Sequence, residues 1–253
     1  MSKIISVHSF RGGTGKSNVT ANLAYTAASR GNRVGIIDTD IQSPGVHVLF
    51  GLGGEQIHRS LNDYLWGRCP IEETACDVSA IAGLPDDGKG RLYVIPSSLN
   101  AGDIARVLRD GYDPALLNDG FRALIERMKL DMLFIDTHPG VNEETLLSIA
   151  ISDALVILLR PDQQDYQGTA VTVDLARRLA VPILVLAVNK VLPLFDMDAI
   201  KREAEATFNA PVAGVLPLSE EMVRLGSSDL FCRRYPDHPF TKGVRQILTS
   251  LVG

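Results

Sequence analysis

The 253-residue sequence contains no apolar run that approaches the roughly 18 to 20 residues of a membrane-spanning helix. Its first residues resemble a strand, so we expect no secretory leader. Cysteine is scarce: Cys69, Cys76 and Cys232 include no C-x-x-C pair, and their odd number argues against a disulfide framework. We therefore expect three ordinary reduced thiols in a cytoplasmic protein.

Positive charge is not in excess. The net charge is −5, from 25 Lys and Arg against 30 Asp and Glu, so there is no global attraction to nucleic acid or anionic lipid. Binding to either would need a local patch. The length suits one large α/β domain or two small ones. Because no linker, repeat or low-complexity segment divides the chain, we expect a single domain over residues 1–253.

One glycine-rich segment dominates the sequence. The apolar run 4–7 is followed by Phe10-Arg11-Gly12-Gly13-Thr14-Gly15-Lys16-Ser17, and residues 18–30 then show helical apolar spacing from Asn18 onward. Three glycines in four positions let backbone N–H groups converge on an anion, and a helix N-terminus adds its dipole. Lys16 would reach the β- and γ-phosphates, and the Ser17 hydroxyl would ligate Mg²⁺. The segment predicts a nucleotide-binding site.

Apolar, β-branched runs alternate with helical patterns along the chain, which favours a parallel sheet covered on both faces. We expect strands at 3–9, 33–38, 92–95, 132–136, 154–159, 182–188 and 213–216.

The strict P-loop pattern G-x-x-x-x-G-K-[ST] fails here, because its first glycine falls on Phe10. The segment resembles instead the deviant Walker A motif, K-G-G-x-G-K-[ST], of the MinD/ParA family of ATPases. The resemblance covers nearly the whole chain and implies a three-layer P-loop NTPase, an open, twisted, mostly parallel sheet flanked by helices. In that family the first lysine crosses a dimer interface to the partner's nucleotide. The resemblance implies this role for Arg11, which keeps the charge but replaces an ammonium with a planar fork.

Carboxylates follow two of the expected strands, at the sheet edge where open α/β folds bind ligands. Asp38 and Asp40 either cap a turn, or Asp40 orients the attacking water or holds Mg²⁺ through an outer-shell contact. The family's D-x-D pattern, whose second Asp is tied to hydrolysis, favours a functional Asp40, with a switch loop at 41–45. Asp136 ends an apolar strand in the Walker B arrangement and is expected to reach Mg²⁺ through water.

The sequence continues Asp136-Thr137-His138-Pro139-Gly140, and His138 stands where the family commonly has proline. His138 has either a direct role or a structural one. Phosphoryl transfer depends mostly on positioning and charge, which favours the structural role. Gly140 would let this loop rearrange when a γ-phosphate is present.

The expected strand 182–188 runs into Asn189-Lys190, but the aspartate of the GTPase pattern N-K-x-D is replaced by Leu192. Leu192 cannot accept the guanine hydrogens, so the pattern favours adenine. The resemblance agrees: it implies that Asn189 contacts the adenine edge and that Pro217 flanks the base. Alternatively, Asn189 is a strand-terminating turn residue.

The C-terminal residues Val244, Ile247, Leu248, Leu251 and Val252 form an apolar stripe at helical spacing. The stripe is either a membrane-surface helix or a final helix docked on the body; few cations and no aromatic anchor favour docking. Three basic pairs either line a DNA-facing patch or are solvated. They are Arg177-Arg178, Lys201-Arg202 and Arg233-Arg234.

The sequence features predict an ATPase that binds Mg-ATP, and the resemblance implies that it forms a nucleotide-sandwich homodimer and positions DNA, a division site or protein cargo. Hydrolysis would be slow and stimulated by an activator protein, and the protein would be cytoplasmic or peripheral on a membrane or nucleoid. Lys16, Asp40 and Arg11 are the expected catalytic group, and Ser17, Asp40 and Asp136 the expected magnesium group. One alternative is a non-hydrolysing scaffold. A metal-cluster carrier is disfavoured, because it needs paired cysteines.

Overall fold

The computed structural model describes residues 2–252. Eight strands form one sheet in the order β3-β4-β2-β5-β1-β6-β7-β8, in which only the short β3 pairs antiparallel. The strands are β1 (Lys3–His8), β2 (Arg33–Asp38), β3 (Cys76–Asp77), β4 (Arg91–Ile95), β5 (Met132–Asp136), β6 (Ala154–Leu159), β7 (Ile183–Val191) and β8 (Val212–Pro217).

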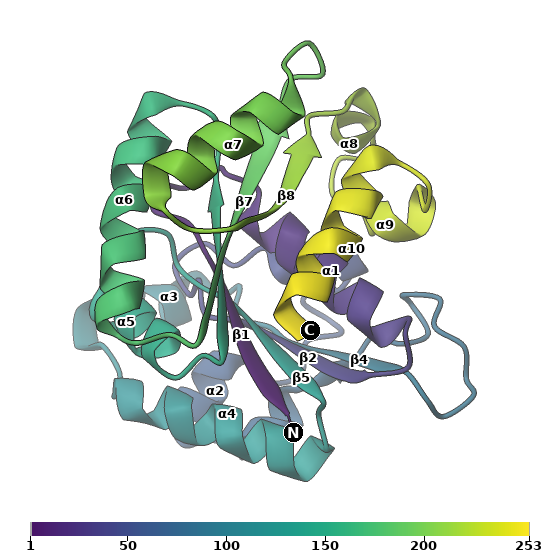
Figure 1. Cartoon of the computed structure of the whole chain (residues 1–253). Coiled ribbons are helices and arrows are strands. Elements are labelled where there is room, and N and C mark those ends of the chain that lie inside the picture. Colours follow the sequence, from purple (N-terminus) through teal and green to yellow (C-terminus); the bar gives the residue numbers. More distant parts are fainter. Residues whose placement is uncertain (1, 253) are drawn as a thin grey trace.

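Helices cover both faces of this sheet (Figure 1). They are α1 (Lys16–Ala28), α2 (Leu61–Leu65), α3 (Ala101–Asp110), α4 (Pro114–Met128), α5 (Glu143–Ala150), α6 (Gln163–Arg178), α7 (Met197–Phe208), α8 (Glu220–Leu225), α9 (Phe231–Arg234) and α10 (Pro239–Val252), with 3-10 helices η1 (Val46–Phe50) and η2 (Ile71–Thr74). The expected three-layer, mostly parallel α/β fold is confirmed.

Alternation of side chains along the strands builds apolar clusters on both faces of the sheet. In β5, Phe134 faces the cluster beneath α1 and α10, whereas Leu133 and Ile135 face the cluster beneath α2 and α4. Because both faces are buried, the central strands are continuous apolar runs, and the expected ranges 33–38, 132–136 and 154–159 are confirmed.

The C-terminal helix α10 is docked on the body. Four residues of its apolar stripe are 0–1% exposed, and only Val252, at 37%, reaches solvent appreciably. The helix lies close to β8 because Gly243 and Gly214 leave room; a Cβ on Gly243 would lie 2.5 Å from Cδ2 of Leu216. The membrane-surface interpretation of this stripe is therefore wrong for this conformation. Within residues 2–252, no helix combines the length and apolar character needed to cross a bilayer.

Candidate active site

The glycine-rich loop connects the end of β1 to the start of α1. Gly13 and Gly15 have φ values of 78° and 92°, in the left-handed region that favours glycine. Gly15 is also the residue that caps α1, and a Cβ there would lie 2.7 Å from Nδ2 of Asn189. The loop conformation thus depends on glycine, and it places the first turn of α1, including Ser17 and Asn18, directly after the loop.

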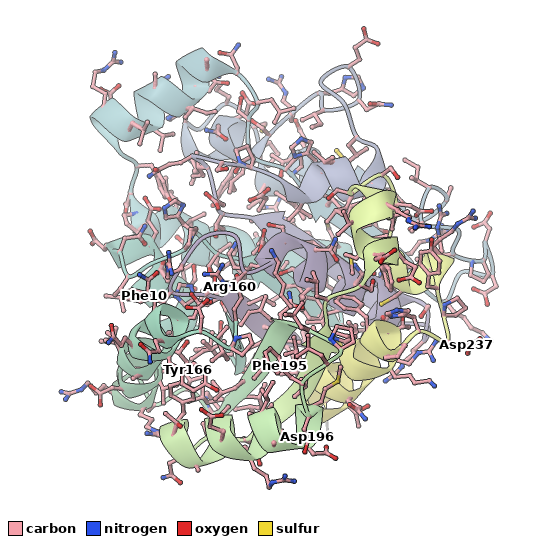
Figure 2. The ribbon with its side chains drawn as sticks, turned by 90° about the horizontal axis from the view of Figure 1, so that it is seen from above. Phe10, Arg160, Tyr166, Phe195, Asp196 and Asp237 are labelled. Atoms are coloured by element: carbon pink, nitrogen blue, oxygen red, sulfur yellow. The ribbon has the colours of Figure 1, made fainter. Side chains whose placement is uncertain are left out.

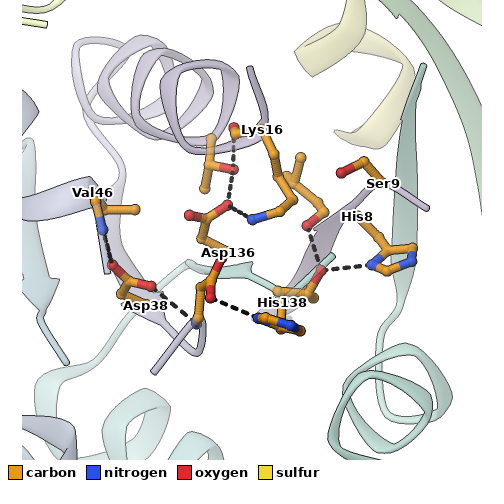
Figure 3. A network of polar contacts seen from close by, with 12 residues as sticks. His8, Ser9, Lys16, Asp38, Val46, Asp136 and His138 are labelled. Atoms are coloured by element: carbon orange, nitrogen blue, oxygen red, sulfur yellow. Dashed lines mark hydrogen bonds and ion pairs between the residues drawn. The ribbon is translucent and has the colours of Figure 1, made fainter. Parts of the chain in front are cut away.

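Lys16 and Asp136 form a buried ion pair beneath this loop (Figure 3). Lys16 Nζ lies 3.0 Å from Asp136 Oδ1, and the two side chains are 7% and 0% exposed. Thr20 Oγ1 lies 3.2 Å from the same oxygen. The other oxygen, Asp136 Oδ2, and Thr14 Oγ1 are buried without a hydrogen-bond partner among residues 2–252. These unpartnered atoms leave bonding capacity for a ligand beside the lysine.

The residues present fit a magnesium ion held jointly with phosphate. Within residues 2–252 there is no group of three His, Cys, Asp or Glu side chains able to cage a metal. Mg²⁺ needs no such cage, since it keeps several waters and binds through a hydroxyl or carboxylate plus substrate phosphates. Ser17 faces the loop after β2, where its Oγ lies 4.0 Å from the place of a Cβ on Gly45.

Asp38 shapes that loop. Its carboxylate accepts backbone N–H bonds from Asp40 (3.1 Å), Gly45 (3.0 Å) and Val46 (3.3 Å). Burial, reinforced by the neighbouring Asp136, raises the pKa of Asp38 to about 7. Asp38 therefore forms the turn after β2, in agreement with the turn-capping interpretation of this segment.

Asp40 points instead at the loop after β5. Its Oδ1 lies 2.7 Å from Nδ1 of His138 (Figure 3), and the two side chains are 12% and 24% exposed. The two residues are 98 positions apart in the sequence. Nothing in the sequence pattern predicts this contact.

Arg11 is 41% exposed and binds within its own chain. Its Nη1 donates to Gln164 Oε1 and lies 3.8 Å from Asp165 Oδ1, both on α6. Asp165 is almost fully buried and also binds Arg160, with Nε 3.0 Å from Oδ2. Figure 2 shows Phe10 and Arg160 together at this edge of the molecule, near the start of α6.

A pocket of about 190 Å³ lies beside the loop, between the start of α1 and the ends of β7 and β8. Asn189 Nδ2 donates to the Thr14 carbonyl at 2.7 Å, and Lys190 Nζ donates to the Gly13 carbonyl at 2.7 Å. Among residues 2–252, none of those lining the pocket carries a carboxylate. Its lining residues are Gly15, Asn18, Asn189, Lys190, Pro217, Leu218, Ser219, Met222 and Phe240.

A family model described as "ParA: NUBPL iron-transfer P-loop NTPase" matches residues 1–252. The chain belongs to the ParA family of P-loop NTPases. An uncharacterised ATP-binding protein of Methanocaldococcus jannaschii is 26% identical over 100% of this chain and 89% of its own length. An iron–sulfur cluster carrier protein of Pseudomonas fragi is 30% identical over 74% of this chain and 59% of its own length.

Solved structures agree in fold. The cell-division ATPase MinD of Pyrococcus furiosus superposes with a TM-score of 0.81 at 21% identity, covering 99% of this chain and 98% of that one. The septum site-determining protein MinD of Pyrococcus horikoshii, complexed with Mg-ADP, gives 0.79 at 19% identity, covering 100% and 96%. Identities this low show the shared fold alone.

Several contacts of this ParA-family site escape the sequence analysis. Gly168, in the middle of α6, accommodates Phe10: a Cβ there would lie 2.0 Å from Cδ1 of the ring. Lys190 braces the loop, and Thr20 braces Asp136. The small residue at 168 is the one available signal, because an interior glycine in a helix often reflects close packing.

We expect Gly168→Ala to weaken nucleotide binding by displacing Phe10 and the loop it begins. The added methyl group overpacks the contact, which typically costs about 1–3 kcal/mol, partly offset by the roughly 1 kcal/mol advantage of alanine in a helix. Calorimetric titration with Mg-ADP checks this. Gly54→Ala is the matched control, because its Cβ meets nothing within 4 Å. Equal affinities for the two variants would contradict the packing argument.

His8, at the end of β1, is fully buried beside this site. Thr137 Oγ1 donates to the Val7 carbonyl at 3.1 Å, so His8 Nδ1, 2.8 Å from that hydroxyl, must be the donor between them. Nε2 is buried with no partner among residues 2–252. Burial, helped by the positive charge of Lys16, lowers the pKa of His8 from 6.5 to about 3.

This lowered pKa predicts an acid-sensitive stability. A histidine whose folded-state pKa is depressed stabilises the fold above its unfolded pKa of 6.5, and that contribution is lost as pH falls toward 3. Relative to His8→Asn, the wild type should lose up to about 1.4 kcal/mol of unfolding free energy per pH unit in this window. Urea unfolding of both proteins between pH 7 and pH 4 measures the difference. A difference independent of pH would show that His8 does not titrate this way.

Proposed function

We propose that this chain binds Mg-ATP in the glycine-rich loop and hydrolyses it. The observation that carries the proposal is the buried Lys16–Asp136 pair, which lies where the loop meets the first turn of α1. A lysine and an unpartnered carboxylate oxygen below loop amides suit a phosphate with its cation. Entry of the γ-phosphate would draw Lys16 away from Asp136 and free the carboxylate.

Each side of the site has its own task. The amides of Gly12, Gly13, Thr14 and Gly15 would cradle the phosphates. When bound, Mg²⁺ would neutralise charge on the phosphate oxygens. Ser17 would hold the ion directly, and Asp136 and Asp40 would hold its water ligands. Asp40 would also orient the attacking water.

We propose adenine as the base, held by Asn18, Asn189 and Pro217. With Asn189 Nδ2 engaged by the Thr14 carbonyl, its Oδ1 can accept from the adenine amino group. Guanine would bury two hydrogen-bond donors in a pocket without a carboxylate acceptor. Leaving such donors unpaired costs about 1–3 kcal/mol each.

We further propose that two ATP-bound copies form a nucleotide sandwich in which Arg11 reaches the partner's phosphates. Its 41% exposure supports this, since its hydrogen bond to Gln164 is exposed and its 3.8 Å contact with Asp165 is a long one. Release would leave Asp165 paired with Arg160, so it should come at modest cost. In this proposal Arg11 takes the role of the first lysine of the deviant Walker A motif. We also propose that residues 1–253 form a single domain. The dimer would act as a switch that positions DNA, a division site or protein cargo, released by hydrolysis that an activator protein stimulates.

The proposal is tested by following phosphate release and molar mass together. We expect slow hydrolysis of ATP in the presence of Mg²⁺, weaker use of GTP, and a dimer with ATP that returns to monomer with ADP. Asp40→Ala should retain ATP binding and remain dimeric. Binding and dimerisation without hydrolysis by the wild type would favour the non-hydrolysing scaffold. No binding at all would reject the nucleotide switch.

A second candidate function is iron–sulfur cluster transfer, which the description of the family model and the carrier relative suggest. The cysteine thiols of this chain disfavour it. Metal ligation requires thiolates. Burial raises the pKa of Cys69 and of Cys76, and it raises the pKa of Cys232 to about 11. Iron and sulfide analysis of protein purified without oxygen settles the matter, and stoichiometric iron would reverse our preference.

A further inference from the structure

His138 is the residue to which the side chain of Asp40 is bound. Among residues 2–252 no other group donates to the Asp40 carboxylate, whose Oδ1 lies 2.7 Å from His138 Nδ1. A carboxylate only accepts hydrogen bonds, so Nδ1 carries the proton in this contact. The second oxygen, Oδ2, has no hydrogen-bond partner among residues 2–252, and the Asp40 side chain is 12% exposed.

The loop that carries His138 is itself anchored at both ends. Thr145 Oγ1, on α5, donates to the His138 carbonyl at 3.4 Å, and the Gly140 N–H donates to the Ser9 carbonyl at 3.2 Å. Asn142 caps α5 through the Thr145 N–H at 2.8 Å. The imidazole is thus presented from a braced loop that also touches the start of the glycine-rich segment.

The backbone next to Asp40 is held by the end of β5, the strand that precedes the His138 loop. Both the N–H and the hydroxyl of its neighbour Thr39 donate to the Asp136 carbonyl, each at 3.0 Å. Backbone contacts therefore place Asp40 beside the end of β5, and the His138 contact fixes how its carboxylate is turned. A side chain without a donor at position 138 would leave the carboxylate free to rotate.

We propose that His138 is a positioning residue for Asp40. It occupies Oδ1 and leaves Oδ2 to orient the water that attacks ATP. Because His138 lies two residues after Asp136, the last residue of β5, this contact also ties the water-orienting carboxylate to the magnesium side of the site. The inference rests on the proposed hydrolysis, which it deepens; His138 acts through Asp40 and not on the substrate.

The kinetic test compares His138→Ala, His138→Asn and the control His58→Ala, an exposed histidine. Losing a partner that orients a catalytic group typically costs 10- to 100-fold in activity. We expect His138→Ala to lower kcat by roughly that factor with little change in the KM for ATP, whereas His138→Asn, whose amide can donate at about the reach of Nδ1, recovers most of it. An unchanged kcat in His138→Ala, or an equal loss in His138→Asn, would overturn the inference.

The contact can be observed without nucleotide or turnover. The ¹⁵N spectrum of the five histidine rings should show His138, assigned by its absence in His138→Asn, as the Nδ1–H tautomer. Asp40→Ala should shift this ring and leave that of His58 unchanged. An Nε2–H tautomer, or a ring indifferent to Asp40→Ala, would refute the contact.

The two failures are distinguishable. If the wild type hydrolyses no ATP, the proposed function fails and this inference with it. If the wild type hydrolyses ATP and Asp40→Ala does not, while His138→Ala keeps full kcat, the positioning role alone is rejected.

Discussion

Lys16→Ala is expected to weaken binding of Mg-ATP by roughly 100-fold and to stop hydrolysis. The substitution removes a charge-assisted contact to phosphate, and such contacts are worth about 1.5–3 kcal/mol. It also strands the Asp136 carboxylate, which is 0% exposed and whose one other hydrogen bond among residues 2–252 comes from Thr20. Breaking a buried ion pair from one side costs about 3–5 kcal/mol of unfolding free energy. Calorimetry and urea unfolding measure the two effects.

A second variant separates binding from folding. Lys16→Ala combined with Asp136→Asn removes the stranded charge, so it should recover much of the lost stability without recovering nucleotide affinity. If the double variant bound Mg-ATP like the wild type, Lys16 would not be the phosphate ligand.

Arg11→Ala is expected to abolish the ATP-dependent dimer and to reduce hydrolysis on the order of 10³-fold. An arginine supplied by a second molecule to a transferring phosphoryl group is worth 10³- to 10⁵-fold in kcat. Arg11→Lys keeps the charge but loses the fork, so it should restore dimerisation better than it restores rate. Light scattering with ATP and single-turnover hydrolysis provide the two readouts.

Gln164→Ala is the matched control for Arg11. It removes the α6 partner to which Arg11 donates within its own chain and leaves the arginine in place. The dimer should persist or become tighter, since Arg11 is then easier to release. An Arg11→Ala protein that dimerises with ATP as well as the wild type does would contradict the role across the interface.

The sequence predicts the central fold because its strands are buried on both faces. Apolar runs such as 132–136 and 154–159 can be buried along their whole length only as central strands of a covered sheet. Both ranges agree with the observed strands. The prediction misses α3, which buries only Val107, and β3, which has two residues. Such elements depend on tertiary contacts that no local pattern encodes. The strand β7 was placed too short, because its end pairs Val191 with Pro217 across an irregular register.

The candidate site divides in the same way. Residues on adjacent parallel strand ends must meet, so Asp38 and Asp136 come into register and Lys16 lies beside them. The contacts of Asp40 with His138 and of Arg11 with α6 join segments 98 and 153 residues apart. They depend on how loops turn after the strands end, which spacing cannot reveal. The docking of α10, in contrast, could be predicted, because the apolar stripe has few flanking cations and no aromatic anchor for a membrane surface.

Isothermal titration of the folded protein with ATP, in the presence and absence of Mg²⁺, tests the central claim most directly. We expect saturable binding with one nucleotide per chain, tighter with Mg²⁺ than without. We expect this binding to be lost in the Lys16→Ala, Asp136→Asn double variant, once urea unfolding has shown that variant to be folded. Absence of heat and of competition by a fluorescent ATP analogue, in protein shown to be folded, would contradict the account.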